Sequence, residues 1–156
     1  MNRTGAWTYA TATAHAVVSD GISTVAISGI VTPAVACQVL ADNARWLRQT
    51  RAMAQVASYQ FSNVAVTSDA LLSSAAAHAN DGLDVPTALL VMQDQFDLFD
   101  GYSSLMARRG ICRAPLLEWG PALSWAQRQA AVMEQMRAGS RPAEVRTGVA
   151  WRPDPR

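Results

Sequence analysis

The residues best placed to do chemistry lie in the stretch FSNVAVTSDALLSS, residues 61–74, where an extended pattern changes to a helical one. Thr67, Ser68 and Asp69 stand together at this corner. Ser68 is a good helix-capping residue, and a carboxylate in the first turn of a helix favours the helix dipole. The same corner could face a protein partner, because Asp69 would supply a permanent negative charge where a phosphorylated serine supplies a larger, reversible one. The residue types therefore indicate either a helix cap or a regulatory switch.

Other side chains that could hold a metal or catalyse a reaction have the wrong spacing. Asp94, Asp97 and Asp100 lie three residues apart, whereas a calcium loop of the EF-hand type takes ligands from positions 1, 3 and 5. We interpret them as helix-capping residues and a solvated helix face. His15 and His78 have no Cys or His at ligand spacing, and no G-x-S-x-G elbow accompanies them. We expect no metal, no cofactor and a non-enzymatic protein.

The composition excludes further classes of chemistry. All thirteen basic residues are arginine, so a phosphate-binding loop of the GxxxxGK[ST] type and a Schiff-base lysine are both impossible. Two cysteines, Cys37 and Cys112, do not make a disulfide framework, and we interpret them as small buried hydrophobic residues. Residues 21–41 carry no charge but are interrupted by Gly29 and Pro33. We expect a soluble, cytoplasmic protein with no membrane insertion.

The hydrophobic pattern places these residues on alternating strands and helices. Half of the 156 residues are hydrophobic, enough for the core of one domain. The extended patterns predict strands over residues 7–18, 22–30, 52–61, 86–92 and 111–119. The SDG turn at residues 19–21 joins the first two of these strands into a hairpin. The helical patterns predict helices over residues 33–51, 69–79, 94–109 and 120–138. The last helix has apolar residues at helical spacing at Trp125, Val132, Met133 and Met136. The order predicts a single α/β domain with a mixed, mostly parallel sheet of about five strands and about four helices.

The charge distribution separates the end of the chain from the rest. Residues 1–107 carry four arginines and eight acids, whereas residues 108–156 carry nine arginines and four acids. We expect a folded domain over residues 1–138 and a disordered Arg/Pro-rich tail over residues 139–156. The arginines around Trp151 suit either a solvated tail or the binding of a nucleic acid or an acidic partner. Because only this end is basic, we expect no nucleic-acid binding.

Two stretches resemble a known family. ISTVAISGIVTPAVACQVLADNARWL and QVASYQFSNVAVTSDALL, together with residues 83–135, resemble the STAS (SpoIIAA-like) domain of sulfate-transporter tails and anti-sigma-factor antagonists. The resemblance covers about residues 7–135. It implies the STAS fold and a regulatory role in binding a kinase-like or receptor protein. Some members of the superfamily look like adaptors or apolar-ligand modules instead.

The corner departs from the pattern of the switch-type members of this family, which read Asp-Ser-Ser-Gly-Leu after an Asn-Val pair. Matched on Leu71, the position of the phosphorylated serine falls on Asp69. Matched without a gap from Asn63 and Val64, it falls on Ala70. Neither alignment puts a serine at the acceptor position, so the resemblance extends to the scaffold more readily than to the switch.

Two functions remain as hypotheses. The leading one is a non-enzymatic regulatory or protein-interaction module whose partner surface is the corner of Thr67, Ser68 and Asp69. The alternative is a small apolar-ligand or lipid-binding module. Its pocket would lie between the sheet and the helices and would be lined by Trp46, Phe99 and Tyr102.

Overall fold

The computed structural model describes residues 2–78 and 84–150, with side chains as far as Gly139. Within these residues one sheet has six strands in the order of the chain: β1 Arg3–Thr8, β2 Ala12–Ser19, β3 Ile22–Val31, β4 Ala54–Val64, β5 Thr87–Leu90 and β6 Arg113–Leu116. The helices are α1 Pro33–Thr50, α2 Ser68–Ala76, the short 3-10 helix η2 Gln93–Gln95, α3 Phe96–Ala107 and α4 Trp119–Ala150. The first three strands pair antiparallel, and β3, β4, β5 and β6 pair parallel.

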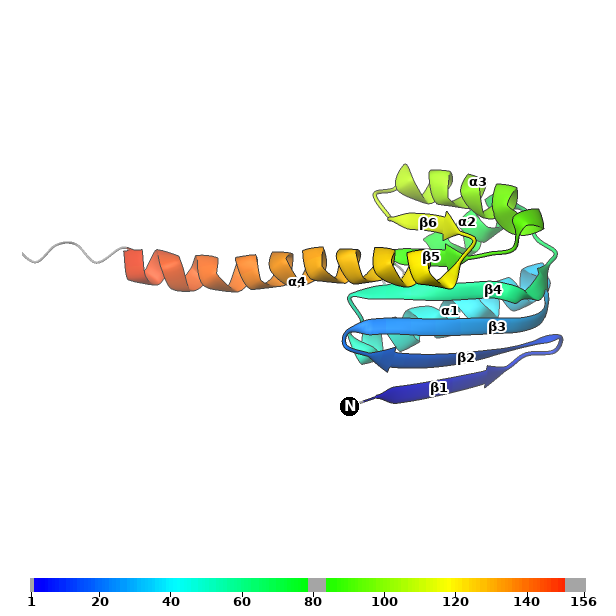
Figure 1. Cartoon of the computed structure of the whole chain (residues 1–156), viewed down its shortest axis with the longest axis horizontal. Coiled ribbons are helices and arrows are strands. Elements are labelled where there is room, and N and C mark those ends of the chain that lie inside the picture. The colour runs from blue at the N-terminus through cyan, green and yellow to red at the C-terminus, as the bar shows by residue number, and fades with distance from the viewer. Residues whose placement is uncertain (1, 79–83, 151–156) are drawn as a thin grey trace, which may run out of the picture.

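The sheet separates two layers of helices (Figure 1). The larger core cluster joins β2, β3 and β4 to α1, α2 and α3, whereas a smaller cluster joins β4 and β5 to α4. Among the helices that the structure describes, only α4 covers the second face, and it extends past the edge of the sheet at which β1 begins (Figure 1). The outer face of β1 and β2 therefore carries no helix among the described residues.

The predicted fold class is confirmed: the protein is a single mixed α/β domain with a mostly parallel sheet and, in the described part of the chain, four α-helices. The predicted number of strands is one too low, because residues 7–18 form parts of two strands. The chain turns at residues 9–11, where the amide of Tyr9 donates to the carbonyl of Ala12 at 2.8 Å. No glycine or proline marks this turn, and threonine and alanine continue to alternate through it.

Several element boundaries also differ from those expected. β4 continues to Val64, three residues past the expected end at Phe61, and β6 is limited to Arg113–Leu116. α4 continues to Ala150 rather than ending near Ala138. The helix passes through Gly139, Pro142 and Gly148, residue types that disfavour a helix interior, so the composition of this segment does not predict where the helix ends. Residues 151–156 lie outside the described residues, and the disordered tail stays a prediction there.

α1 begins and packs as its sequence predicts. Thr32 caps the helix, its Oγ1 accepting from the amide of Val35 at 3.3 Å, and Pro33 occupies the first turn. Trp46 and Leu47 are both buried against the sheet. The indole of Trp46 donates to Ser23 Oγ at 2.9 Å, so the polar end of this side chain is satisfied within the core.

A pair of side-chain amides, one buried and one half-buried, extends this contact between α1 and the sheet. Asn43 Nδ2 donates to Gln55 Oε1 at 2.9 Å, and Gln55 Nε2 donates back to Asn43 Oδ1 at 2.8 Å. Gln55 Nε2 also reaches Ser23 Oγ at 3.2 Å. Because these polar groups are satisfied by one another, they fix the position of α1 on β3 and β4 without leaving an unpaired amide in the core.

The large apolar residues at helical spacing on α4 do not form its buried face, although Trp125 packs half-buried against the sheet. Val132 and Met136 are exposed, and the helix instead buries an alanine at every fourth position, Ala122, Ala126 and Ala130. These methyl groups pack on the small cluster of Ala54, Val56, Ala88 and Leu90. Small side chains let a helix approach a sheet closely, and the larger apolar residues of α4 then fall beside this contact or beyond the end of the sheet.

Replacing Leu47 by alanine should destabilise the protein by about 2–5 kcal/mol, because the side chain is only 1% exposed and its removal leaves a cavity. Met136→Ala, at a position 64% exposed, should change the free energy of unfolding by less than about 0.5 kcal/mol. Urea unfolding followed by circular dichroism measures both. Equal losses in the two variants would contradict the assigned face of α1.

Candidate functional site

The corner lies after β4, on the side of the sheet that carries α1, α2 and α3. Thr67, rather than the expected Ser68, is the residue that caps α2. Its backbone is extended (φ −90°, ψ 161°), and its Oγ1 accepts from the amide of Ala70 at 3.1 Å. The helix therefore begins one residue earlier than predicted, at Ser68.

Ser68 has a different role, in the contact between α2 and α3. Its hydroxyl donates to the carbonyl of Leu98 at 2.7 Å. Gly101 on α3 packs directly against it, since a Cβ at this glycine would lie 2.9 Å from Ser68 Oγ. The half-buried hydroxyl is thus held between two helices, where a phosphate group would not fit without moving α3.

Asp69 is the exposed charge of the corner. It occupies the first turn of α2, and its side chain faces water. The partial positive charge of the helix start favours a carboxylate at this position. Of the three predicted residues, Thr67 caps, Ser68 joins two helices, and Asp69 is the one whose charge is free to meet another molecule.

The three residues predicted to line an apolar pocket are all buried, but they do not share one cavity. Phe99 and Tyr102 lie edge to face with ring centroids 6.5 Å apart, and Tyr59 packs on Phe99 at 4.6 Å. Trp46 lies elsewhere, edge to face with Trp7 at 5.6 Å. These rings fill the space between sheet and helices.

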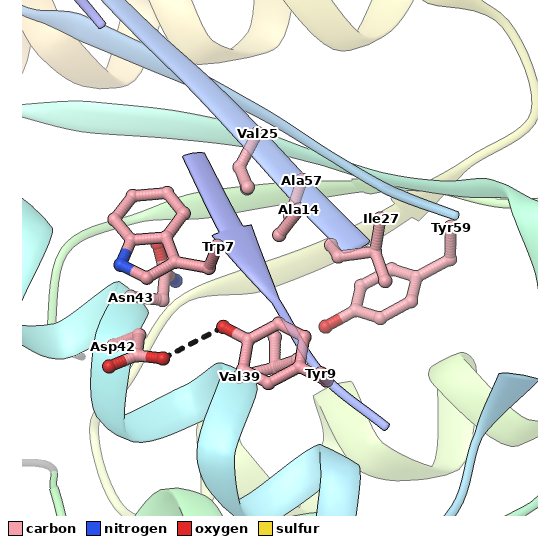
Figure 2. A pocket seen from close by; sticks show the side chains of 10 residues that line it. All are labelled: Trp7, Tyr9, Ala14, Val25, Ile27, Val39, Asp42, Asn43, Ala57 and Tyr59. Carbon is pink, nitrogen blue, oxygen red and sulfur yellow. Dashed lines mark hydrogen bonds between the residues drawn. The ribbon is translucent and has the colours of Figure 1, made fainter. Parts of the chain in front are cut away.

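Within the described part of this layer, two of the cavities are small and lie on either side of Tyr59. Figure 2 shows the first, between β1 and α1, where the hydroxyl of Tyr9 donates to Asp42 Oδ2 at 2.9 Å across its mouth. Its volume is about 10 Å³, and that of the second, next to Phe99 and Tyr102, is about 20 Å³. A single water needs about 10–15 Å³ by this measure, so neither cavity has room for a lipid.

Both tyrosines at the first cavity are held in their neutral form. Burial raises the pKa of Tyr59, whose hydroxyl points into the cavity (Figure 2). Burial and the hydrogen bond to Asp42 raise the pKa of Tyr9. Sequence reasoning missed this pair, because Tyr9 lies in the turn that interrupts the first predicted strand.

Other expectations concern metals, cysteines and membranes. Within the described residues, no three His, Cys, Asp or Glu side chains gather in a way that could hold a metal ion. Cys37 and Cys112 are exposed, so the prediction that both are buried is wrong; Cys37 Sγ lies 3.1 Å from Ser74 Oγ at the contact of α1 with α2. Each helix within the described ranges is too short or too polar to cross a membrane.

Comparison with known proteins supports the fold. No protein-family model and no curated protein matches the sequence. The structure is similar to the crystal structure of an anti-sigma factor antagonist from Mycobacterium paratuberculosis, with a TM-score of 0.51 and 17% sequence identity. The match covers 75% of this chain and 95% of that chain. The protein therefore has a STAS-like fold, as the resemblance in sequence implied.

Thr67→Ala and Ser68→Ala should each destabilise the protein by about 1 kcal/mol, for separate reasons: the first removes a helix cap, and the second removes the hydrogen bond that joins α2 to the Leu98 carbonyl of α3. Ser68→Ala should also loosen the contact of α2 with α3, so hydrogen exchange should rise in both helices. Thr67→Ala should raise exchange mainly in the first turn of α2. Identical exchange patterns in the two variants would contradict these separate roles.

Alkaline pH should destabilise the protein through Tyr9 and Tyr59. Their pKa values are raised in the folded state, whereas an unfolded tyrosine ionises near pH 10. The unfolded chain then loses protons first, so their contribution to stability is complete below about pH 10 and is lost as the pH rises further. Urea unfolding between pH 8 and pH 11 (roughly the range around that pKa) measures the decline. The double variant Tyr9→Phe/Tyr59→Phe should show a shallower decline; an unchanged slope would contradict the assignment.

Proposed function

We propose that this protein is a non-enzymatic regulatory module that binds a protein partner through the corner of Thr67, Ser68 and Asp69. The observation that carries the proposal is the exposed carboxylate of Asp69 at the start of α2. The STAS-like fold supports it, since the similar structure is that of an anti-sigma factor antagonist. A kinase-like or receptor protein of the cytoplasm is the kind of partner that this likeness favours.

The chemistry of the corner favours constant rather than switched binding. A phosphoserine would add a charge that a kinase and a phosphatase control. Here Asp69 supplies a fixed single charge, and the Ser68 hydroxyl is already bonded to the Leu98 carbonyl. The partner would therefore meet the same surface at all times, and the amount of partner would set how much complex forms.

Asp69→Asn should weaken partner binding about tenfold, or ~1.4 kcal/mol, because it removes one charge and keeps the shape of the side chain. Its cost to stability should be only about 0.3–1 kcal/mol, from the lost interaction with the helix dipole. The measurement is affinity capture from host lysate with quantitative mass spectrometry, followed by titration calorimetry with the protein identified.

Asp20→Asn is the matched control, since this exposed carboxylate lies in the turn between β2 and β3 and asparagine tolerates its positive φ of 52°. It should bind the partner as the wild type does. Asp69→Ser should bind as weakly as Asp69→Asn and acquire no phosphate in the host. Recovery of the same partner at the same affinity by all variants would mean that the corner is only a helix start.

A further inference from the structure

Five large apolar side chains are exposed around one edge of the sheet. Ile30 is near the end of β3, Phe61 is near the end of β4, and Met92 follows β5. Leu117 and Trp119 lie where β6 ends and α4 begins. The carboxyl ends of parallel strands share one edge, so these side chains gather there; we call the five of them the apolar edge. Phe61 is 71% exposed, which leaves most of its ring in water.

A β-bulge accounts for the exposure of Phe61. Ala26 pairs with Ser58 and Ser28 with Phe61, so two residues of β4 lie opposite one residue of β3 at this point. Simple alternation would turn Phe61 to the same side as the buried Tyr59. The extra residue turns it to the α4 side of the sheet instead.

Two glutamines hold the surrounding segments together. Gln60 Nε2 donates to the carbonyl of Leu117 at 3.1 Å and reaches that of Val91 at 3.5 Å. Gln95 Nε2 donates to the carbonyls of Tyr59 at 3.0 Å and Ser62 at 2.8 Å. The ends of β4, β5 and β6 are thereby fixed side by side. The hydrogen bond from Ser68 to Leu98 continues this network to the corner, since Leu98 follows Gln95 in the first turn of α3.

The charge at this edge has one sign. The segments that form it are residues 9–11, 30–33, 61–69, 91–97 and 117–121, all within the described part of the chain. They contain no arginine, lysine or histidine, and they expose four carboxylates: Asp69, Asp94, Asp97 and Glu118. Four exposed arginines lie instead near the opposite edge, where the parallel strands begin: Arg3, Arg51, Arg108 and Arg109. The edge would repel phosphate groups and attract cations.

We propose that the apolar edge and its four carboxylates form the docking surface for a protein whose contact face is apolar at its centre and bordered by arginine or lysine. This inference rests on the proposed function, since Asp69 belongs to the same edge. Aromatic side chains such as Phe61 and Trp119 supply most of the binding energy when a partner buries them, and surrounding charges steer the encounter and select the partner. A nucleic acid or an anionic membrane is negatively charged, as the edge is, so the edge would repel it.

The test uses a fluorescent synthetic peptide that forms an amphipathic helix with one face of leucine and one of arginine. A second peptide carries glutamate in place of arginine, and a third is residues 139–156 of this chain. Fluorescence anisotropy gives the affinity of each for the wild type, Phe61→Ser, Glu118→Gln and Met136→Ser. Circular dichroism confirms that each variant is folded. Met136 is the matched control, because it is an exposed apolar residue on α4 away from this edge.

The arginine peptide should bind the wild type, and Phe61→Ser should weaken it at least tenfold. Glu118→Gln should weaken it several-fold at low salt and less at high salt, Met136→Ser should leave it unchanged, and the glutamate peptide should not bind. Failure of the arginine peptide to bind, or equal binding by Phe61→Ser, overturns the proposal. So does tighter binding of residues 139–156, which would make a second copy of this chain the occupant.

The partner captured through Asp69 separates this inference from the proposed function. If Asp69→Asn weakens that partner and Phe61→Ser does not, the apolar edge is not its docking surface, and the proposed function stands. If Phe61→Ser weakens it and Asp69→Asn does not, the docking surface stands, and the role of the corner fails. A loss of partner affinity in both variants supports both the proposed function and the docking surface.

Discussion

The parallel pairing of β3 with β4 is the constraint on which the rest of the structure depends. It runs from Ile22 opposite Ala54 to Val31 opposite Val64, and it is the point at which an antiparallel sheet becomes a parallel one. Parallel neighbours need a crossover, which α1 supplies. Every later strand then ends at the same edge, so the corner, the two glutamines and the apolar edge meet there without any long loop to bring them together.

The core fixes this pairing on one face more firmly than on the other. Below α1, large side chains and the polar contacts among Ser23, Asn43 and Gln55 define one register. Below α4 the contact consists mainly of small residues, with alanines on the helix facing alanine, valine and leucine on β4 and β5. Small residues bring α4 close to the sheet, Trp125 packs half-buried beside them, and Trp119, Val132 and Met136 stay exposed. That is why Trp119 can take part in the apolar edge at the start of the same helix.

The sequence predicts the features that local chemistry determines. Thr32 with Pro33 marks the start of α1, and the spacing of Trp46 and Leu47 identifies its buried face, as the structure confirms. The sequence does not predict the features that tertiary contacts determine. The turn at residues 9–11 has no turn residues, and α4 buries alanines rather than its larger side chains. At the corner the residue types are compatible with capping by either Thr67 or Ser68, and only the position of α3 assigns the Ser68 hydroxyl to Leu98.

The bulge in β4 connects the corner with the apolar edge. An uninterrupted strand would have turned Phe61 to the side of Tyr59, and the apolar edge would then have lacked its most exposed ring. With one extra residue, β4 keeps Tyr59 in the core, exposes Phe61 on the opposite face and still ends at Val64, from which the chain reaches Thr67. A partner that buried the ring of Phe61 would therefore also approach the carboxylates of this edge. Apolar contact would then slow the dissociation of the complex. The fixed negative charges, Asp69 among them, would restrict binding to partners with a basic border.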